Sequence, residues 1–340
     1  MGVRVGINGY GRIGRSFHRA LLARGGGDVE LVAVNDPFGD NETMAFLLKH
    51  DSVGRTLPNE VKATDAGFSV DGKEVKKLEV REPGDIPWAD NGVDVVIEST
   101  GLFTAREKAG AHLNGGAKRV IISAPSGDAD ATICMGVNDE VYDGAQHTVI
   151  SNASCTTNCL APMAKVLNDT YGIEQGYMLT IHAYTSDQQL QDQATATRSG
   201  KPDLRRMRAA ALSIIPNTTG AAKAIGLVLP ELKGKLDGMA MRVPTPTGSI
   251  TDLTAVLKTS ASADDINAAF AKAANDSSFR GVLQYTDETL VSADIVGNSS
   301  SCIFSAADTS ANGTLVKVLG WYDNEWGYSN RLIDLVAFVG

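Results

Sequence analysis

The sequence predicts two domains: an α/β domain with a doubly wound parallel sheet, followed by an α+β domain with a mostly antiparallel sheet. Up to about residue 154, short β-branched runs alternate with helical patterns, which is typical of parallel strands joined by helices. Beyond that point the pattern changes to a series of strands with few helices between them. The 340 residues are enough for two domains that each bury a core.

The chain begins with a strand, a glycine-rich turn and a helix. A strand over residues 3–8 leads into Gly9-Tyr-Gly-Arg-Ile-Gly14, and a helix is expected from residue 15 to about residue 24. Gly9 permits the tight turn, Gly11 allows a backbone to approach a pyrophosphate, and Gly14 allows the helix to pack on the strand. The N-terminus of the helix would then face the phosphates of a dinucleotide.

The second expected strand, over residues 29–35, ends in Asp36, which lies 22 residues beyond Gly14. At this distance a carboxylate binds the hydroxyls of the adenosine ribose and repels a 2′-phosphate, so the sequence favours NAD over NADP. A plain turn residue is the alternative, and the glycines make it the weaker one. Strands expected over residues 93–101 and 119–124 place small polar residues, Ser123 among them, near the same cofactor crevice.

The remaining elements are predicted from periodicity and turn residues. Helices are expected at 43–49, 264–274 and 328–339, a hairpin at 68–75 around Asp71-Gly72, and strands at 177–185, 239–243, 248–258 and 315–322. The last helix could dock back on the first domain.

Cys155 stands where another helix should begin. A β-branched run over residues 147–150 precedes it, Ser154 adjoins it, and an apolar helical pattern follows. The positive end of the helix dipole and free backbone N–H groups favour the thiolate, which is the nucleophilic form. The alternative is a buried structural cysteine, but the small polar residues around Cys155 fit a nucleophile better. Cys159 is expected to be a small packing residue.

A cysteine nucleophile of this kind needs a base beside the sulfur. A thiolate adds to an aldehyde carbonyl, and a neighbouring nicotinamide then accepts a hydride and leaves a thioester. Of the five histidines, His182 is the best candidate because it stands at the polar end of the strand expected at 177–185. The alternative is a hydrogen-bonded strand histidine, which spacing alone does not exclude.

Composition excludes several classes of partner. The net charge is −9 and 21% of residues are charged, without a broad basic region, so neither nucleic acid nor an anionic membrane is expected as a main partner. Four sparse cysteines favour reduced thiols and a cytoplasmic protein. We find no signal peptide, no apolar run long enough to span a membrane, and no metal-binding pattern.

A phosphate-bearing ligand must therefore be held by local arginines and backbone amides. Arg242, Arg206 and Thr185, together with Thr219 and Gly220, are arranged along the second half of the chain so that they could bind two phosphates. Taken singly, each arginine could equally be a surface ion-pair partner.

Six ordered segments resemble the phosphorylating glyceraldehyde-3-phosphate dehydrogenases along nearly the whole chain. They are residues 6–15, 98–101, 153–162, 182–185, 241–245 and 321–328. The resemblance implies an α/β Rossmann dinucleotide-binding domain at residues 1–154, completed by a C-terminal helix at 323–340, and an α+β catalytic domain with a mostly antiparallel sheet at 155–322. It also implies a homotetramer, in which the long loop after the histidine strand lines a subunit interface.

The resemblance further implies roles for matching positions. Cys155 would be the nucleophile and His182 its base, converting glyceraldehyde 3-phosphate and inorganic phosphate to 1,3-bisphosphoglycerate. Ser154, Thr156, Thr185, Arg206, Thr219, Gly220 and Arg242 would hold the substrate and the attacking phosphate. Gly9, Gly11, Arg12, Ile13, Gly14, Asp36, Arg81, Thr100, Ser123 and Asn324 would hold NAD.

The loop at residues 186–203 departs from the family pattern. Ser186 replaces the asparagine that is usual in this family, and the loop is roughly five residues longer than the usual family loop. One hypothesis is that this loop reshapes the approach to Cys155, as in an isozyme that tolerates thiol-directed inhibitors. Grafting a typical loop would then change the rate of inactivation by such inhibitors.

Two other functions fit the same residues. Erythrose-4-phosphate dehydrogenase shares the fold and the site, and it differs in oxidising a longer aldehyde, often without phosphate. A catalytically silent NAD-sensing protein is the alternative from another class, although the presence of both Cys155 and His182 argues against it.

Overall fold

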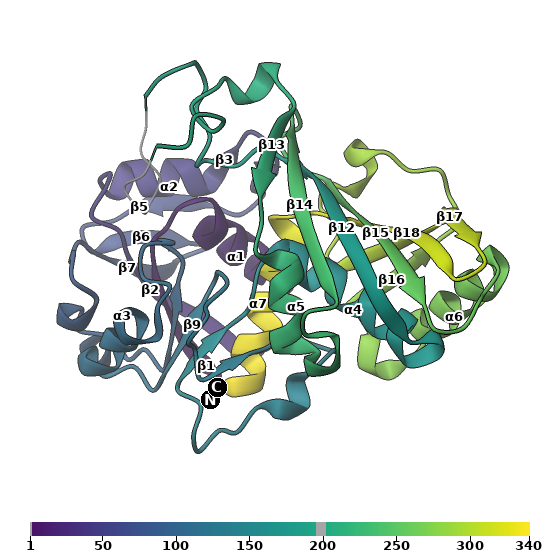
Figure 1. The fold of residues 1–340 in the computed structure, drawn as a ribbon. Coiled ribbons are helices and arrows are strands. Elements are labelled where there is room, and N and C mark those ends of the chain that lie inside the picture. The colour runs from purple at the N-terminus through teal and green to yellow at the C-terminus, as the bar shows by residue number, and fades with distance from the viewer. Residues whose placement is uncertain (1, 195–201) are drawn as a thin grey trace. The chain divides into compact units, whose positions relative to one another are not determined.

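The computed structural model describes residues 2–194 and 202–340, which divide into two compact units. The first unit contains the residues up to Ile133, Glu140–Ala153 and Ser329–Gly340. The second contains Cys134–Asp139 and Ser154–Tyr328. Figure 1 shows the elements of both, and each unit is described by itself.

The first unit is built on a nine-stranded sheet in the order β10-β11-β9-β8-β1-β2-β7-β6-β5. All neighbouring pairs are parallel except β5–β6 and β6–β7. The strands are β1 (Val3–Asn8), β2 (Val29–Asn35), β5 (Val61–Ala63), β6 (Gly67–Val70), β7 (Lys73–Leu78), β8 (Val95–Glu98), β9 (Arg119–Ile122), β10 (Ala131–Thr132) and β11 (Val149–Ser151).

The strand order reverses at β1, which has β2 on one side and β8 on the other. At such a point the connections leave in opposite directions, and the crevice at the carboxyl ends of the strands is where α/β sheets bind ligands. The helices are α1 (Arg12–Ala23), α2 (Asn41–Lys49) and α3 (Arg106–Gly110), with a two-stranded ribbon of β3 (His50–Asp51) and β4 (Arg55–Thr56).

Most of the predicted elements of this unit are confirmed, and the differences lie at the start of α1 and between β9 and β11. The helix expected from residue 15 begins three residues earlier, at Arg12, directly after the N-cap Gly11. No residue between Arg12 and Arg15 prevents this earlier start. The hairpin turn is confirmed, with φ of +51° at Asp71 and +81° at Gly72, as a type I′ turn requires. Between β9 and β11 the described residues form only β10 and a short 3₁₀ turn at Asp139–Val141, so the strand–helix alternation is incomplete there.

The second unit is built on a seven-stranded sheet in the order β13-β14-β12-β15-β18-β17-β16. Only β12–β14 and β16–β17 are parallel, so the sheet is mostly antiparallel, as predicted. The strands are β12 (Ile173–Ala183), β13 (Ile215–Thr218), β14 (Leu236–Val243), β15 (Ser249–Leu257), β16 (Leu283–Thr286), β17 (Cys302–Asn312) and β18 (Leu315–Tyr322).

Two helices pack on this sheet. The helix α4 (Cys155–Tyr171) lies against β15, β17 and β18, and α6 (Ala263–Ala274) lies against β16 and β17. A third helix, α5 (Ala221–Val228), packs on α4 and β14. Phe270 of α6 stacks on Phe304 of β17 with ring centroids 3.8 Å apart, which places the core between the helices and the sheet.

Several elements of this unit were not predicted. The strand β12 begins four residues before the expected residue 177, and β13, β16, β17 and α5 were missed. Pro216 interrupts the strand pattern, so the sequence did not predict β13. The proline is tolerated because β13 is an edge strand. Of the unusual loop at 186–203, residues 195–201 lie outside the described residues.

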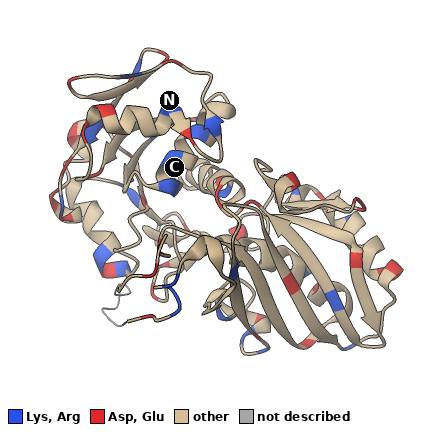
Figure 2. Ribbon diagram, turned by 90° about the horizontal axis from the view of Figure 1, so that it is seen from above, with Lys and Arg blue, Asp and Glu red and all other residues tan. Residues whose placement is uncertain are grey.

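The last helix, α7 (Trp326–Val339), contributes Ser329–Gly340 to the first unit. There Arg24, which follows α1, donates to Asn330 at 2.7 Å and forms an ion pair with Asp334 at 2.6 Å. Figure 2 shows basic and acidic residues interspersed along the elements of both units. Among the described residues, no helix combines the length and apolar character that a membrane crossing requires.

Candidate active site

Cys155 is the first residue of α4, and Ser154 is its N-cap. The Ser154 side chain accepts the Thr157 N–H at 3.0 Å, and the Asn158 amide donates to the Ser154 carbonyl at 3.0 Å. Ala153, just before the cap, has φ of +54°, an uncommon value for a residue with a side chain. This capped turn starts the helix at the cysteine, so the thiol lies at the positive end of the helix dipole.

The structure brings Cys155 and His182 together. His182 lies one residue before the end of β12 and is 4% exposed. Its Nε2 lies 3.5 Å from the half-buried Cys155 Sγ, which is within reach of a hydrogen bond involving sulfur. The described cysteines Cys134, Cys159 and Cys302 are all buried, so Cys159 is a packing residue as expected.

Hydrogen bonds at the other ring nitrogen determine which nitrogen of His182 can accept a proton. Nδ1 lies 2.7 Å from the Ala183 carbonyl and 2.9 Å from Nη1 of Arg242. The two hydrogens of that Nη1 have acceptors of their own, the Ala183 carbonyl at 2.9 Å and Thr185 Oγ1 at 3.0 Å. We therefore assign the imidazole hydrogen to Nδ1, which leaves Nε2 free to accept the thiol proton.

The charge state of the pair differs from the sequence-based expectation. Burial raises the pKa of the Cys155 thiol to about 11, although the Arg242 charge and hydrogen bonds from Thr156 lower it. Burial and, to a lesser extent, the Arg242 charge together lower the pKa of His182 to about 3. Desolvation therefore opposes the thiolate that the helix terminus was expected to favour, and it outweighs the Arg242 charge and the hydrogen bonds from Thr156. Cys155 and His182 form a neutral thiol–imidazole pair.

Tyr322 of β18 is a further site residue, which the sequence analysis did not single out. Its hydroxyl hydrogen bonds Thr156 Oγ1 and Thr180 Oγ1, each at 2.8 Å. Its ring meets the His182 ring edge-on, with centroids 6.0 Å apart. Tyr322 thus links α4, which begins with the cysteine, to β12, which contains the histidine. Its only signal in the sequence was its place in the segment 321–328.

Hydrogen bonds and an ion pair connect the side chains of Arg242 and Arg206 to that of His182. Arg242 is paired with His182 in the parallel register of β12 and β14. Thr185 Oγ1 contacts both Arg242 and the Asp187 carboxylate. Asp187 in turn forms an ion pair with Arg206, which also binds Asp203 at 3.2 Å. Asp187, the bridge between the two cationic groups, was not predicted.

The remaining predicted substrate residues flank this network. Ser154 and Thr156 adjoin the cysteine. Gly220 is the N-cap of α5, where an added Cβ would meet no atom within 4 Å, and Thr219 Oγ1 accepts the Ala221 N–H at 3.2 Å. The second unit therefore contains a thiol, a base, two guanidinium groups and the N-terminus of α5 among its predicted site residues. Among the described residues, no group of three or more His, Cys, Asp or Glu side chains is placed to hold a metal ion.

The glycine-rich turn of the first unit fits a dinucleotide. Gly9 has φ of +92°, and a Cβ there would lie 2.6 Å from the Thr100 backbone nitrogen. A Cβ on Gly14 would lie 2.6 Å from the Gly9 carbonyl oxygen, so α1 needs glycine to pack on β1. A Cβ on Gly11 would meet no protein atom within 4 Å, which leaves that side of the turn open to a ligand.

Other predicted cofactor residues gather at the carboxyl ends of β1, β2, β8 and β9. Asp36 accepts the Tyr10 N–H at 2.9 Å and the Phe38 N–H at 3.0 Å. The Arg81 guanidinium lies 5.8 Å from the centre of the Phe38 ring.

The side chains of the remaining cofactor residues have protein partners. Arg12 forms an ion pair with Asp51, Thr100 donates to Glu98, and Ser123 donates to the Glu98 carbonyl. Ile13 lies in the first turn of α1. Asn324 belongs to the second unit, where its Oδ1 accepts the Ser249 hydroxyl at 2.8 Å.

This fold and these contacts define a class: a dehydrogenase with a dinucleotide-binding domain and a cysteine paired to a histidine. Comparison with known proteins narrows the class. Residues 3–106 match the NAD binding domain of glyceraldehyde 3-phosphate dehydrogenase, and residues 154–324 match its C-terminal domain. The chain belongs to the glyceraldehyde-3-phosphate dehydrogenase family.

Similar proteins are found in several bacteria. The chain is 58% identical to a glyceraldehyde-3-phosphate dehydrogenase of Streptomyces coelicolor over 341 aligned positions, which cover 100% of this chain and 99% of the relative. It is 60% identical to that of Mycobacterium avium over 345 positions and 59% identical to that of Mycolicibacterium smegmatis over 346 positions, with the same coverage. The chain is thus an NAD-dependent oxidoreductase of this family.

Proposed function

We propose that this enzyme oxidises glyceraldehyde 3-phosphate and phosphorylates the product to 1,3-bisphosphoglycerate, with Cys155 as the nucleophile and His182 as its base. The observation that carries the proposal is the 3.5 Å contact between Cys155 Sγ and an imidazole nitrogen whose tautomer leaves it free to accept a proton. Full-length relatives named for this activity support it.

The neutral pair suggests how the first step runs. As Sγ bonds to the aldehyde carbon, the thiol proton passes to His182 Nε2 and then to the developing alkoxide, which gives a hemithioacetal. No separated ion pair has to be maintained beforehand. Arg242 keeps the proton on the imidazole transient, because its charge opposes protonation of His182.

Oxidation and phosphorylation follow at the same carbon. NAD, when bound, supplies the acceptor for the hydride that leaves this carbon. His182 takes the hydroxyl proton, so the carbon becomes a thioester carbonyl on Cys155. A phosphate oxygen then attacks the thioester, the C–S bond breaks, and the sulfur of Cys155 takes the proton that His182 holds.

One group of residues would hold both anionic groups. We assign Arg242, Thr185 and Arg206, with Ser154, Thr156, Thr219 and Gly220, to the substrate phosphate and to inorganic phosphate. Arg206 is paired with Asp187 and Asp203, so an incoming phosphate would compete with carboxylates for its guanidinium. This competition would make phosphate binding salt-dependent.

The cofactor would be held by the turn Gly9, Gly11, Arg12, Ile13 and Gly14, and by Asp36, Arg81, Thr100, Ser123 and Asn324. The open space at Gly11 and the carboxylate of Asp36 support NAD in this position. We assign the NAD-binding domain to residues 1–154, completed by the C-terminal helix at 323–340, and the catalytic domain to residues 155–322.

The decisive experiment is NADH formation from glyceraldehyde 3-phosphate and NAD, with and without inorganic phosphate. We expect phosphate-dependent activity that Cys155→Ser abolishes and that His182→Asn lowers by a factor of about 10² to 10⁴. Activity that ignores phosphate, together with turnover of erythrose 4-phosphate, would favour the erythrose-4-phosphate dehydrogenase reading. NAD binding without any turnover would favour the silent sensor.

We further propose a cytoplasmic homotetramer in which the described residues of the segments 186–194 and 202–214 form an interface. Leu190, Leu204, Leu212 and Ile214 are each at least 69% exposed, an unusual density of large apolar side chains on a surface. Light scattering should give four copies for the wild type and a smaller assembly for Leu212→Asp. Leu227→Asp, at another exposed leucine, is the matched control.

A further inference from the structure

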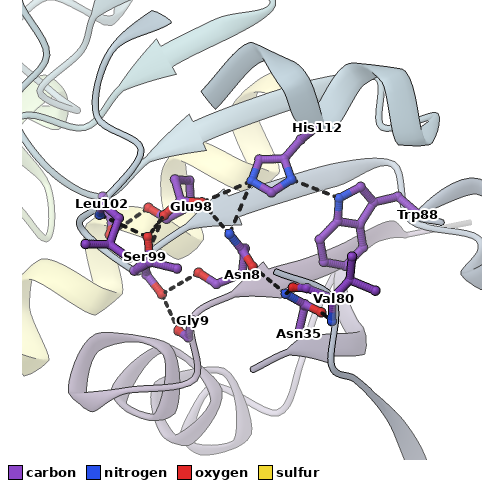
Figure 3. Close-up of polar contacts among 11 residues, drawn as sticks. Asn8, Gly9, Asn35, Val80, Trp88, Glu98, Ser99, Leu102 and His112 are labelled. Carbon is purple, nitrogen blue, oxygen red and sulfur yellow. Dashed lines mark hydrogen bonds and ion pairs between the residues drawn. The ribbon is translucent and has the colours of Figure 1, made fainter. Parts of the chain in front are cut away.

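A buried polar network joins the ends of neighbouring strands in the first unit (Figure 3). Its centre is Glu98, the last residue of β8, which is 2% exposed. Asn8 ends β1 and Asn35 ends β2, and His112 is 0% exposed. None of these four residues has a role in the proposed chemistry, yet burying so many polar groups is costly unless every one is hydrogen-bonded.

Both carboxylate oxygens of Glu98 receive hydrogen bonds. Oε2 accepts the Asn8 amide at 2.6 Å and lies 3.0 Å from His112 Nε2. Oε1 accepts the Thr100 N–H at 2.9 Å and the Thr100 hydroxyl. Donors on every side indicate that Glu98 is an ionised acceptor, because a protonated carboxyl group would leave one of these donors without a partner.

Trp88 determines the tautomer of His112. Its indole N–H, which can only donate, points to His112 Nδ1 at 3.1 Å. The imidazole hydrogen therefore lies on Nε2 and is donated to Glu98. The result is a neutral histidine that holds a carboxylate in one orientation, with the histidine itself held by the tryptophan.

The network touches four segments that bear predicted cofactor residues. Asn8 precedes Gly9, Glu98 holds Thr100 directly, and Asn35 precedes Asp36. Asn35 donates to Asn8 Oδ1 at 2.7 Å and to the Val80 carbonyl at 2.8 Å, next to Arg81.

The glycine-rich turn is in contact with the turn after β8. The Ser99 hydroxyl donates to the Gly9 carbonyl, and a Cβ on Gly9 would collide with the Thr100 backbone. A shift of Glu98 would therefore move the Ser99–Leu102 turn relative to the phosphate-binding turn.

We propose that Glu98, held by Asn8 and by the Trp88–His112 pair, is a positioning residue for NAD. It aligns the turn containing Ser99 and Thr100 with the glycine-rich turn, so that the cofactor meets a preformed site. The inference rests on the proposed placement of the cofactor. If the network had only a structural role, breaking it would lower the stability of the fold without specifically lowering the affinity for NAD.

The test is NAD binding by isothermal titration calorimetry on the full chain, with wild type, Glu98→Gln and Glu60→Gln. Glu98→Gln replaces one of the two acceptor oxygens in the network with a donor, whereas Glu60 is a surface carboxylate of the same unit paired only with Lys62 in the described structure. We expect Glu98→Gln to bind NAD about tenfold more weakly and Glu60→Gln to bind it as the wild type does.

Kinetics separate a positioning role from a structural one. For Glu98→Gln the KM for NAD should rise with the dissociation constant, while the KM for glyceraldehyde 3-phosphate stays unchanged. An unchanged NAD affinity with a lowered melting temperature would overturn the proposal. If the wild type itself failed to bind NAD, the proposed function would be at fault instead.

Trp88→Phe provides a second test should Glu98→Gln fold poorly. It removes the indole N–H and retains a large aromatic side chain in the core. We expect NAD affinity to fall by about two- to threefold, a smaller effect because Glu98 keeps its own donors. Unaltered affinity in Trp88→Phe would show that His112 does not pass its orientation to the cofactor site.

Discussion

At the scale of single residues, the site depends on the positive charge of Arg242, which acts on the pKa of both Cys155 and His182. The same guanidinium lowers the pKa of Cys155 and the pKa of His182, while burial acts on the two groups in opposite directions. The pair therefore rests neutral but needs little rearrangement to transfer a proton over 3.5 Å. Reactivity at neutral pH then depends on Arg242 as much as on the helix terminus.

Replacing Arg242 with glutamine should raise the pKa of both members of the pair. We expect the pH profile for alkylation of Cys155 by iodoacetamide to move upward by roughly one unit or more, because the thiolate loses a nearby positive charge. Arg205→Gln is the control, since Arg205 is exposed and donates to the Pro216 carbonyl. A profile that stays in place in Arg242→Gln would contradict this electrostatic account.

Tyr322→Phe should weaken the second unit. The variant keeps the ring beside His182 but leaves the buried hydroxyls of Thr156 and Thr180 without their partner. We expect a loss of about 1–3 kcal/mol in the free energy of unfolding, measured by urea titration. Tyr177→Phe, at a tyrosine that is 53% exposed on β12, should change it little. Equal stability of the two variants would count against the role of Tyr322.

At the scale of elements, the turn between β1 and α1 uses its glycines for different purposes. Gly14 is needed for packing within the protein, since its Cβ would lie 2.6 Å from the Gly9 carbonyl oxygen. Gly11 faces open space and has a φ of −75°, which any residue can adopt. The turn therefore separates fold from ligand binding, one glycine for each.

This separation predicts opposite behaviour of two alanine variants. Gly14→Ala should lower the melting temperature, because backbone atoms must move to admit the methyl group. Gly11→Ala should leave the melting temperature of the ligand-free protein nearly unchanged and weaken NAD binding, because the methyl group occupies the space proposed for the pyrophosphate. Calorimetry on both variants checks this, and loss of stability in Gly11→Ala would refute the assignment.

At the scale of the whole molecule, buried neutral histidines make stability depend on pH. Burial lowers the pKa of His18 to about 3, and its Nδ1 lies 2.7 Å from the Tyr10 hydroxyl. In the unfolded chain the pKa of histidine is about 6.5. Between these values the unfolded state binds more protons, so the contribution is complete above pH 6.5 and is lost as the pH falls toward 3.

We expect the melting temperature of the wild type to fall between pH 6.5 and pH 4, and that of His18→Gln to fall less steeply, because glutamine does not titrate there. Asp130→Asn is a contrasting variant. Burial raises the pKa of Asp130, but hydrogen bonds from Arg106, Val149 and Thr148 lower it by more, so that the pKa lies at about 2. The stability that the Asp130 carboxylate contributes should persist down to pH 4 and be lost only below that pH. Identical slopes for wild type and His18→Gln would disprove the prediction.

The local chemistry of this protein was determined by the sequence alone. Residues 9–14 predicted the dinucleotide turn, Asp71-Gly72 predicted its hairpin, and Ser154-Cys155 predicted the start of α4, because caps and turns depend on a few neighbouring side chains. The two-domain fold class also followed from the pattern of strands and helices. The start of α1 and the edge strand β13 did not, since packing overrides weak local signals there.

Only the tertiary structure decided how distant residues act on one another. It placed Asp187 between Thr185 and Arg206, Tyr322 against His182, and Glu98 at the junction of β1 and β8. It also showed that burial opposes the thiolate of Cys155, because desolvation depends on the whole surrounding chain rather than on the residues next to the cysteine. Burial and contacts between remote segments are collective properties, which no local pattern specifies.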